Sequence, residues 1–246
     1  MKFPPVKPTY NQLDTLYQST VTAGQMREYR FQVSGGVNKM VAVRVNVSSS
    51  NAQETYPVMF VVIQQKGVIS WELPLEVASS FYNQRYDTIA RTLCPMDFGD
   101  KEVSNLVIRV TCISPSDTAY RLIVSTINDF EIKLSANHTV IATPSQPQYY
   151  HFKFTDGIDA VQVQGHSKDK ICATISVQKA TCPVFDLLRS VEFIGKHQTL
   201  TTTSSIIVQK RDFTDFFIVL VVHPIDTECS ELNQGVSIGE EAHNNL

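Results

Sequence analysis

The sequence lacks a long hydrophobic run. Its longest one, FFIVLVV at residues 216–222, is far shorter than the roughly 20 residues that a membrane-spanning helix needs. We therefore expect no transmembrane helix in this chain, and we expect a buried strand at this run. The first residues, MKFPPVKP, also have no apolar segment of the kind that signal peptides carry.

Charge is sparse as well. Charged residues make up 18% of the chain, against 43% hydrophobic residues, and this balance is typical of a folded protein with a real core. The net charge of −3 and the pI of about 6.1 argue against a general nucleic-acid binder, which is usually basic, although they allow a local basic patch. Full protonation of the six His would bring the formal charge from −3 to +3, so affinity for polyanions could rise in acid.

Catalytic and metal-binding motifs are missing. The chain has no GxSxG, HExxH, P-loop or Rossmann glycine pattern, and its five Cys show neither CxxC nor Cys/His metal spacing. We therefore predict that it is not an enzyme and uses no cofactor or metal. The odd number of Cys means that at least one has no disulfide partner within the chain, and the residues alone leave the pairing open.

Strand signals fill the chain, and they occur twice. Residues 29–37 read YRFQVSGGV and residues 150–158 read YHFKFTDGI, each followed by an alternating segment, at 40–47 and 160–164. Gly35-Gly36 and Asp156-Gly157 predict hairpin turns at these two places. Further along, MFVVIQQK and ICATISVQK correspond in order and both end in Gln-Lys.

This ordered repeat predicts a duplicated antiparallel unit. We expect an all-β fold of two tandem antiparallel β-sandwich, jelly-roll-like domains, at residues 1–128 and 129–235. Residues 236–246 are polar and acidic, and we expect a tail or linker there. In the echo, Arg30 of the first copy becomes His151, which we interpret as a surface position that is charged only in mild acid.

Three sets of residues are candidates for binding or modification. A nucleic-acid surface would use the scattered cations Arg27, Arg30, Lys168, Lys170, Lys196, His197, Lys210 and Arg211, if the fold brings them to one face. A sterol-type V-x-Y-x-R pattern is formed by Val77, Tyr82 and Arg85. Asn46 and Asn137 begin glycosylation sequons, which favour a secreted or luminal chain.

Longer motifs carry a more specific signal. TCPVFD, FIGKHQT and VQKRDF, within residues 171–213, and YPVMFVVIQQKGVISWELPL, RTLCP and SQPQYYHFKF upstream resemble the ectodomain of the systemic-RNAi-defective (SID) transmembrane family. The resemblance covers roughly residues 18–230.

The resemblance implies an extracellular or lysosomal-luminal part of a multi-pass membrane protein, with the protein's own transmembrane domain as a partner. It implies disulfides Cys94–Cys182 and Cys172–Cys229, with Cys112 left over. Family members transport double-stranded RNA or take up cholesterol, and a hydrolase-like site proposed for their membrane domain lies outside this chain. The leading interpretation is therefore pH- and salt-dependent binding of double-stranded RNA. The alternatives are an ectodomain that supports cholesterol uptake and a structural ectodomain that forms a homodimer without binding cargo.

Overall fold

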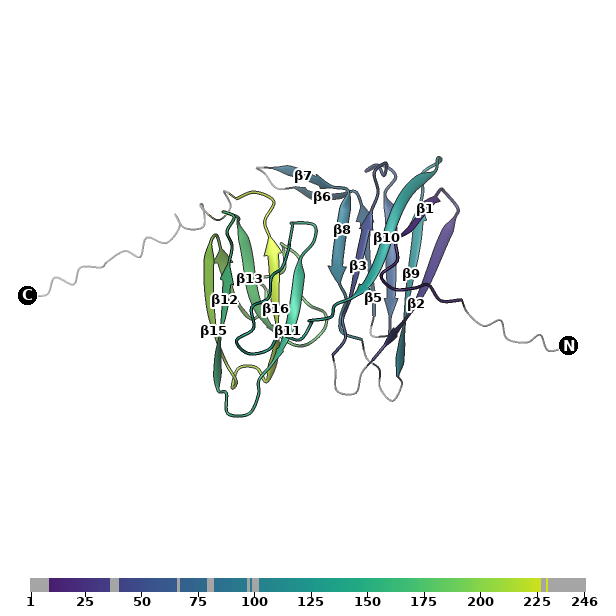
Figure 1. The fold of residues 1–246 in the computed structure, drawn as a ribbon. Helices are drawn as coiled ribbons and strands as arrows, with labels where there is room; N and C mark the ends of the chain where they lie inside the picture. Colours follow the sequence, from purple (N-terminus) through teal and green to yellow (C-terminus); the bar gives the residue numbers. More distant parts are fainter. Residues whose placement is uncertain are drawn as a thin grey trace, which may run out of the picture.

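The fold is all-β, as the composition predicts. The computed structural model describes residues 9–35, 40–65, 67–78, 82–96, 98, 102–226 and 229, so Gly36 and the tail at 236–246 lie outside the described residues. Figure 1 shows two groups of strands side by side, the first in purple to teal and the second in green to yellow. In the described part of the chain, no helix is long and apolar enough to cross a membrane.

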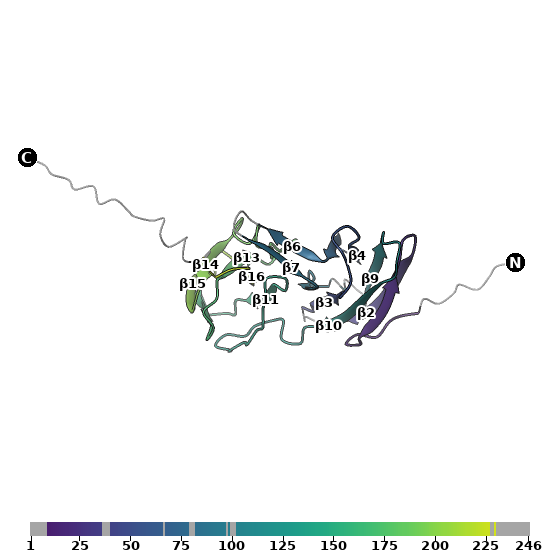
Figure 2. The same cartoon turned by 90° about the horizontal axis from the view of Figure 1, so that it is seen from above.

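The first unit contains two four-stranded antiparallel sheets. One has the order β2-β9-β4-β5, with β2 at Met26–Ser34, β9 at Val103–Cys112, β4 at Val58–Gln64 and β5 at Gly67–Leu73. The other has the order β1-β10-β3-β8, with β1 at Tyr17–Val21, β10 at Thr118–Thr126, β3 at Val43–Ser48 and β8 at Thr88–Thr92. A separate hairpin, β6 (Leu75–Ala78) with β7 (Asn83–Tyr86), extends over the junction toward the second unit (Figures 1 and 2). Without this hairpin, the strand order is that of an eight-stranded jelly roll.

The second unit repeats one of these sheets. Its four-stranded sheet has the order β11-β16-β13-β14, with β11 at Gln148–Lys153, β16 at Asp215–Val222, β13 at Ala173–Lys179 and β14 at Lys196–Leu200. The opposing sheet pairs β12 (Ala160–His166) with β15 (Thr203–Gln209). Chain order and pairing make β11, β16, β13 and β14 the counterparts of β2, β9, β4 and β5.

Each unit has its own core because alternate residues of facing strands point inward. In the first unit, Phe31, Val45, Phe60 and Leu122 are fully buried between the sheets. In the second, Phe152, Ile175, Val208 and Phe216 form the corresponding cluster. Burial of each such side chain contributes about 1.5–3 kcal/mol, so these clusters are a major source of each unit's stability.

The two predicted hairpins are wrong. The strands on either side of the first turn, β2 and β3, belong to different sheets, and so do β11 and β12. Both turns are therefore crossovers from one sheet to the other, and Gly157 adopts a left-handed φ of 79° in the second one. The mistake has a physical cause, since a strand followed by a turn looks the same in a hairpin and in a crossover, while long-range packing selects the partner.

Strand register relates the two copies residue by residue. Arg30 pairs with Val107 across β2 and β9, and His151 pairs with Phe217 across β11 and β16. Continued along the strands, this register places Glu28 and Arg109 at the positions of Tyr149 and Val219. Cys112 pairs with Val58 in the first unit, and the equivalent pair in the second unit is Val222 with Ala173. Counted along β4 and β13 from Val58 and Ala173, Gln64 therefore corresponds to Lys179. The sequence match between the two Gln-Lys endings, at residues 65–66 and 178–179, is therefore offset by two residues from the correspondence of the strands.

Candidate functional site

The predicted basic residues lie in three separate places. Arg27 and Arg30 are on β2, three positions apart, so they point to opposite faces of the sheet. The Arg30 guanidinium contacts the Glu28 carboxylate at 2.7 Å, and Arg109 contacts the same carboxylate at 2.9 Å. Both hydrogen bonds lower the pKa of Glu28, and the bond from Arg109 has the larger effect. The positive charge of Arg30 and Arg109 is therefore partly compensated.

Lys168 and Lys170 lie in the exposed connection between β12 and β13. This connection follows His166, at the end of β12 that pairs with the start of β15. The remaining cations lie beyond the other end of the same strand pair. Because β12 has seven residues, the two groups are separated by roughly 20 Å.

The largest group gathers at that other end of the second unit. Lys196 begins β14, His197 follows it, and Lys210 and Arg211 follow β15. The Lys196 ammonium donates to the Asp212 carboxylate at 2.8 Å, and this bond is the main reason that the pKa of Asp212 is lowered. The Arg211 guanidinium lies 3.8 Å from the same carboxylate.

Two further cations share this end, and the sequence reasoning missed them. Lys153 ends β11 and pairs with Asp215 at the start of β16, while Lys179 ends β13 beside Phe216. We call Lys153, Lys179, Lys196, Lys210 and Arg211 the basic end. Its signal in the sequence was a lysine or arginine at or next to the end of successive strands. The same end also carries the carboxylates Asp156, Asp159, Asp212 and Asp215, so its charge is mixed.

His151 does not lie on the surface, which corrects the interpretation of the Arg30 position in the echo. The side chain is 2% exposed, stacks on Phe130 at 6.5 Å between ring centroids, and places Nε2 3.2 Å from the Asp215 carboxylate. The outer face of its sheet is covered, whereas the face that carries Arg30 is open. A charge at His151 therefore cannot contact a polyanion directly.

The three residues of the sterol-type pattern lie on or beside the β6–β7 hairpin. Val77 is on β6, Arg85 is on β7, and Tyr82 lies in the connection between the two strands. The Arg85 guanidinium is engaged by the Asp87 carboxylate at 3.1 Å and by the Ala52 carbonyl at 2.9 Å. Its head group is thus held by two acceptors of the protein, while the side chain is 43% exposed.

The two sequons have different surroundings. Asn46 is half-buried on β3, the strand between β10 and β8, whereas Asn137 is exposed in the segment before β11. Asn137 is therefore the more accessible acceptor. Glycosylation of either one stays a prediction.

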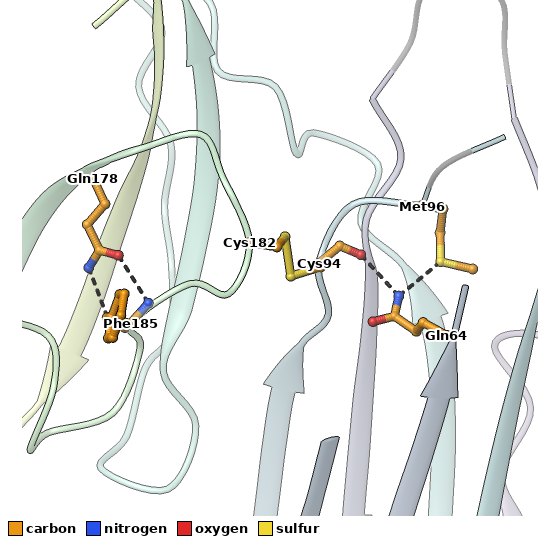
Figure 3. The surroundings of a disulfide bond; sticks show 6 residues. All are labelled: Gln64, Cys94, Met96, Gln178, Cys182 and Phe185. Atoms are coloured by element: carbon orange, nitrogen blue, oxygen red, sulfur yellow. Dashed lines mark hydrogen bonds between the residues drawn. A yellow bond between two sulfur atoms is a disulfide. The ribbon is translucent and has the colours of Figure 1, made fainter. Parts of the chain in front are cut away.

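A disulfide joins the two units. Cys94 follows β8 and bonds to Cys182 in the β13–β14 connection, and Cys172 bonds to Cys229 within the second unit. These are the pairs that the resemblance implied, and Cys112 is free and buried. Figure 3 shows the hydrogen bonds around the first bridge, one to Cys94 itself and two between residues that flank Cys182 in the chain. Gln64 donates to the Cys94 carbonyl at 3.1 Å, and Gln178 and Phe185 exchange hydrogen bonds at 2.9 and 3.1 Å.

Buried charges lie close to this bridge. Arg44 of β3 donates to the Pro147 carbonyl at 2.9 Å, and Arg91 of β8 lies 3.7 Å from the Asp186 carboxylate. Desolvation raises the pKa of Asp186 and lowers the pKa of Arg91. Both shifts disfavour the charged forms, so burial here costs more than the attraction between the two groups returns.

Apolar side chains complete the junction. Ala42 of the first unit packs with Phe130, Tyr149, Phe217 and Val219 of the second, each at most 1% exposed. The outer face of the β11-β16-β13-β14 sheet is thereby buried, partly against the first unit and partly against Val184, Leu188 and Val191 of the β13–β14 connection. The junction is a third hydrophobic core, with a covalent bond beside it, and it fixes the relative position of the units.

No group of three or more His, Cys, Asp or Glu in the described ranges is placed to hold a metal ion. The feature that could bind a ligand is instead the set of charged side chains on the surface of the second unit. The basic end presents side-chain donors from several strand ends on a rigid sandwich, which is suited to contacts with phosphates.

Comparisons with known proteins agree with the resemblance seen in the motifs. A family model described as the dsRNA-gated channel SID-1 matches residues 145–244, which include all strands of the second unit. The chain is 35% identical over 223 residues to SID1 transmembrane family member 1 of Mus musculus, covering 88% of this chain and 27% of that protein. It is 33% identical over 204 residues to cholesterol uptake protein 1 of Caenorhabditis elegans, covering 83% and 26%. The chain thus spans about a quarter of the length of these relatives.

Proposed function

The chain belongs to the SID1 transmembrane family over the segment that it covers, and from this premise we propose that it is a cargo-binding ectodomain for double-stranded RNA. In this proposal it lies on the extracellular or lysosomal-luminal side of a multi-pass membrane protein. It acts by binding, without catalysis and without a cofactor. The transmembrane part of the same protein is its partner.

One observation carries the choice of cargo. The family model that names a dsRNA-gated channel matches the second unit, and this unit carries the basic end. Double-stranded RNA is recognised by shape and by contacts to phosphates and 2′-hydroxyls, which need spaced donors rather than an enclosed pocket. Five cations at four strand ends of one rigid sandwich provide such spacing.

The two disulfides support the location. Disulfides persist in secreted and luminal compartments and are rare in the cytosol. Of the five Cys, four are paired. The exposed sequon at Asn137 agrees with this assignment.

Acidic conditions should strengthen binding. His197 is exposed next to Lys196, at 4.0 Å from the Glu192 carboxylate, so its protonation would add positive charge beside the basic end. The whole-chain shift from −3 toward +3 acts in the same direction. His151 contributes only indirectly, because it is buried.

A charge-matched pair of variants tests the proposed surface. Lys196→Gln/Lys210→Gln/Arg211→Gln should weaken binding of a double-stranded RNA and reduce the slope of log affinity against log salt by about one for each phosphate that the variant no longer binds. The control, Arg30→Gln/Lys168→Gln/Lys170→Gln, removes the same charge elsewhere and should change affinity little. Filter binding across salt concentrations at pH 5 and pH 7 gives both quantities. Equal weakening by the two triple variants, or no binding at pH 5, would contradict the proposal.

Asp212→Asn provides the opposite change. It removes the carboxylate that Lys196 and Arg211 contact and leaves the size of the side chain nearly unchanged. Affinity for double-stranded RNA should rise a few-fold in the same assay. A fall in affinity would show that Asp212 positions the cations rather than neutralising them.

Support for cholesterol uptake is the second candidate function, and the similarity to cholesterol uptake protein 1 of Caenorhabditis elegans favours it. In this case the chain would assist folding and trafficking of a membrane part that handles sterol. Full-length protein that retains sterol uptake after the triple substitution at the basic end, while the isolated chain binds no RNA, would favour this function. Light scattering of the purified chain tests the remaining alternative, a homodimerising ectodomain.

A further inference from the structure

The second unit is a jelly roll with one incomplete sheet. In the first unit, β3 lies between β10 and β8, and β1 pairs with β10. Among the described residues, the counterpart strand β12 pairs only with β15. The counterpart of β1 would fall within residues 132–141, which form no strand, and the counterpart of β10 would follow Val222. As far as the described residues go, this edge of β12 has no neighbouring strand and the space between the two sheets is open on this side.

A cleft of about 360 Å³ occupies the open side, and residues 132–140 lie over it. Apolar side chains of the sandwich interior form much of its walls, including Phe152, Val161, Val163, Ile175 and Leu220, and polar residues such as Gln162 and Gln164 also line it. Val45 and Val47, on the inner face of β3, are fully buried, whereas Val161 and Val163 on β12 are only partly buried. The cleft therefore exposes part of a hydrophobic core that the first unit closes.

The formal charge that lines the cleft is positive and belongs to Lys133. The lining also contains His138 and His166, and none of the lining residues is Asp or Glu. Lys168 and Lys170 lie two and four residues after His166 and are exposed, with one carboxylate, Asp169, between them. An apolar interior with a cationic rim matches a ligand that has an apolar chain and an anionic head.

We propose that this cleft binds an anionic amphiphile of the fatty-acid type, with the acyl chain between the sheets and the carboxylate near Lys133. The cleft volume lies within the range of small-molecule sites. Each methylene that enters leaves water, which drives binding, while the rim selects an anionic head over a neutral one. None of the five residues of the basic end lines the cleft, so the site does not depend on RNA binding.

Titration calorimetry of the full 246-residue chain with decanoate and with 1-decanol, both below their aggregation limits, tests the proposal. We expect decanoate to bind at least about fivefold more tightly than 1-decanol, because only decanoate has a charged head. Lys133→Gln should weaken decanoate binding about three- to tenfold and leave 1-decanol unchanged. Lys179→Gln, which removes the same charge at the basic end, should change neither.

A second pair of variants separates the possible occupants of the cleft. Val161→Trp should block both ligands, and an unchanged unfolding temperature would show that the fold is retained. Removal of residues 230–246 should leave decanoate affinity unchanged. Affinity that rises tenfold or more on truncation would assign the cleft to that chain segment and overturn the proposal. Equal affinity for the two ligands, or no binding of decanoate, would overturn it as well.

Discussion

The two units have the same strand order in their matching sheets, yet they differ in which surfaces are covered. In the first unit, both sheets are complete and the outer face of the β2-β9-β4-β5 sheet is open to solvent. In the second, the corresponding outer face is buried in the junction and the opposing sheet has only two strands among the described residues. The unit with two complete sheets thus exposes this outer face to solvent, and the unit with the shorter opposing sheet has it covered.

Residues at equivalent positions follow this exchange. Glu28 and Arg109 form an ion pair on the open face, and Tyr149 and Val219 occupy their positions on the covered face. Arg30 is exposed, and its counterpart His151 is buried beside Phe130. A duplicated backbone therefore fixes where side chains point, while the surroundings decide which chemistry each position tolerates.

Loss of the bridge between the units should have the largest effect. Cys94→Ser/Cys182→Ser removes a constraint across 88 residues, which contributes up to roughly 4–5 kcal/mol in the loop-entropy description. We expect the single calorimetric transition to separate into two, with each unit unfolding by itself. The matched change Cys172→Ser/Cys229→Ser keeps the bridge between the units, so it should lower the midpoint of the transition without splitting it. A single transition in Cys94→Ser/Cys182→Ser would mean that the junction core alone couples the units.

The covered face should be far more sensitive to truncation than the open one. Phe217→Ala empties a junction position that is 1% exposed and should lower the free energy of unfolding by about 3–5 kcal/mol. Its counterpart Val107→Ala, on the open face, should cost less than about 1 kcal/mol. Urea titration measures both. Similar costs would contradict the assignment of the two faces.

Asp186 should make the junction more stable in acid. Burial raises its pKa above its ordinary value of 3.8, so its contribution is fully present below that value and is lost as pH rises through the raised pKa. Asp186→Asn should remove this pH dependence, and its effect should be smaller than that of Phe217→Ala. Unfolding temperatures from pH 3 to pH 7 follow the difference. A wild-type advantage that grows with pH would have the wrong sign.

Glu28, on the open face of the first unit, should show the opposite and smallest dependence. Its pKa is lowered from 4.5, so its contribution is present above that value and is lost as pH falls through the lowered pKa. Glu28→Gln should lower the unfolding temperature by at most about 2 °C at pH 7, because exposed ion pairs contribute little, and the difference should vanish in acid. High salt should reduce it further.

The sequence was sufficient for the strand-level duplication but not for the connections. Alternation predicted most strands, and the ordered echo predicted the tandem arrangement. The hairpins at residues 35 and 157 were wrong because a strand chooses its partner by packing across the sandwich. The covered face was missed for a similar reason, since no local pattern distinguishes Val219, which meets another unit, from a residue that meets solvent.

The candidate sites also differ in how far the sequence could predict them. Motif resemblance supplied both disulfide pairs, which no spacing rule could have chosen. The basic end required the register of four strands, because Lys153 and Lys179 are distant in sequence from Lys196. The cleft could not be anticipated at all, since it arises where β1 and β10 have no counterpart among the described residues, rather than from residues that form a motif.

The bridge between Cys94 and Cys182 has a consequence for proteolytic processing. Residues 133–139 are all exposed, and they lie between these two Cys in the chain. A protease that cut there would sever the peptide backbone without separating the two fragments. The nicked protein would migrate as one species until it was reduced, because the bridge would still hold the two fragments together covalently.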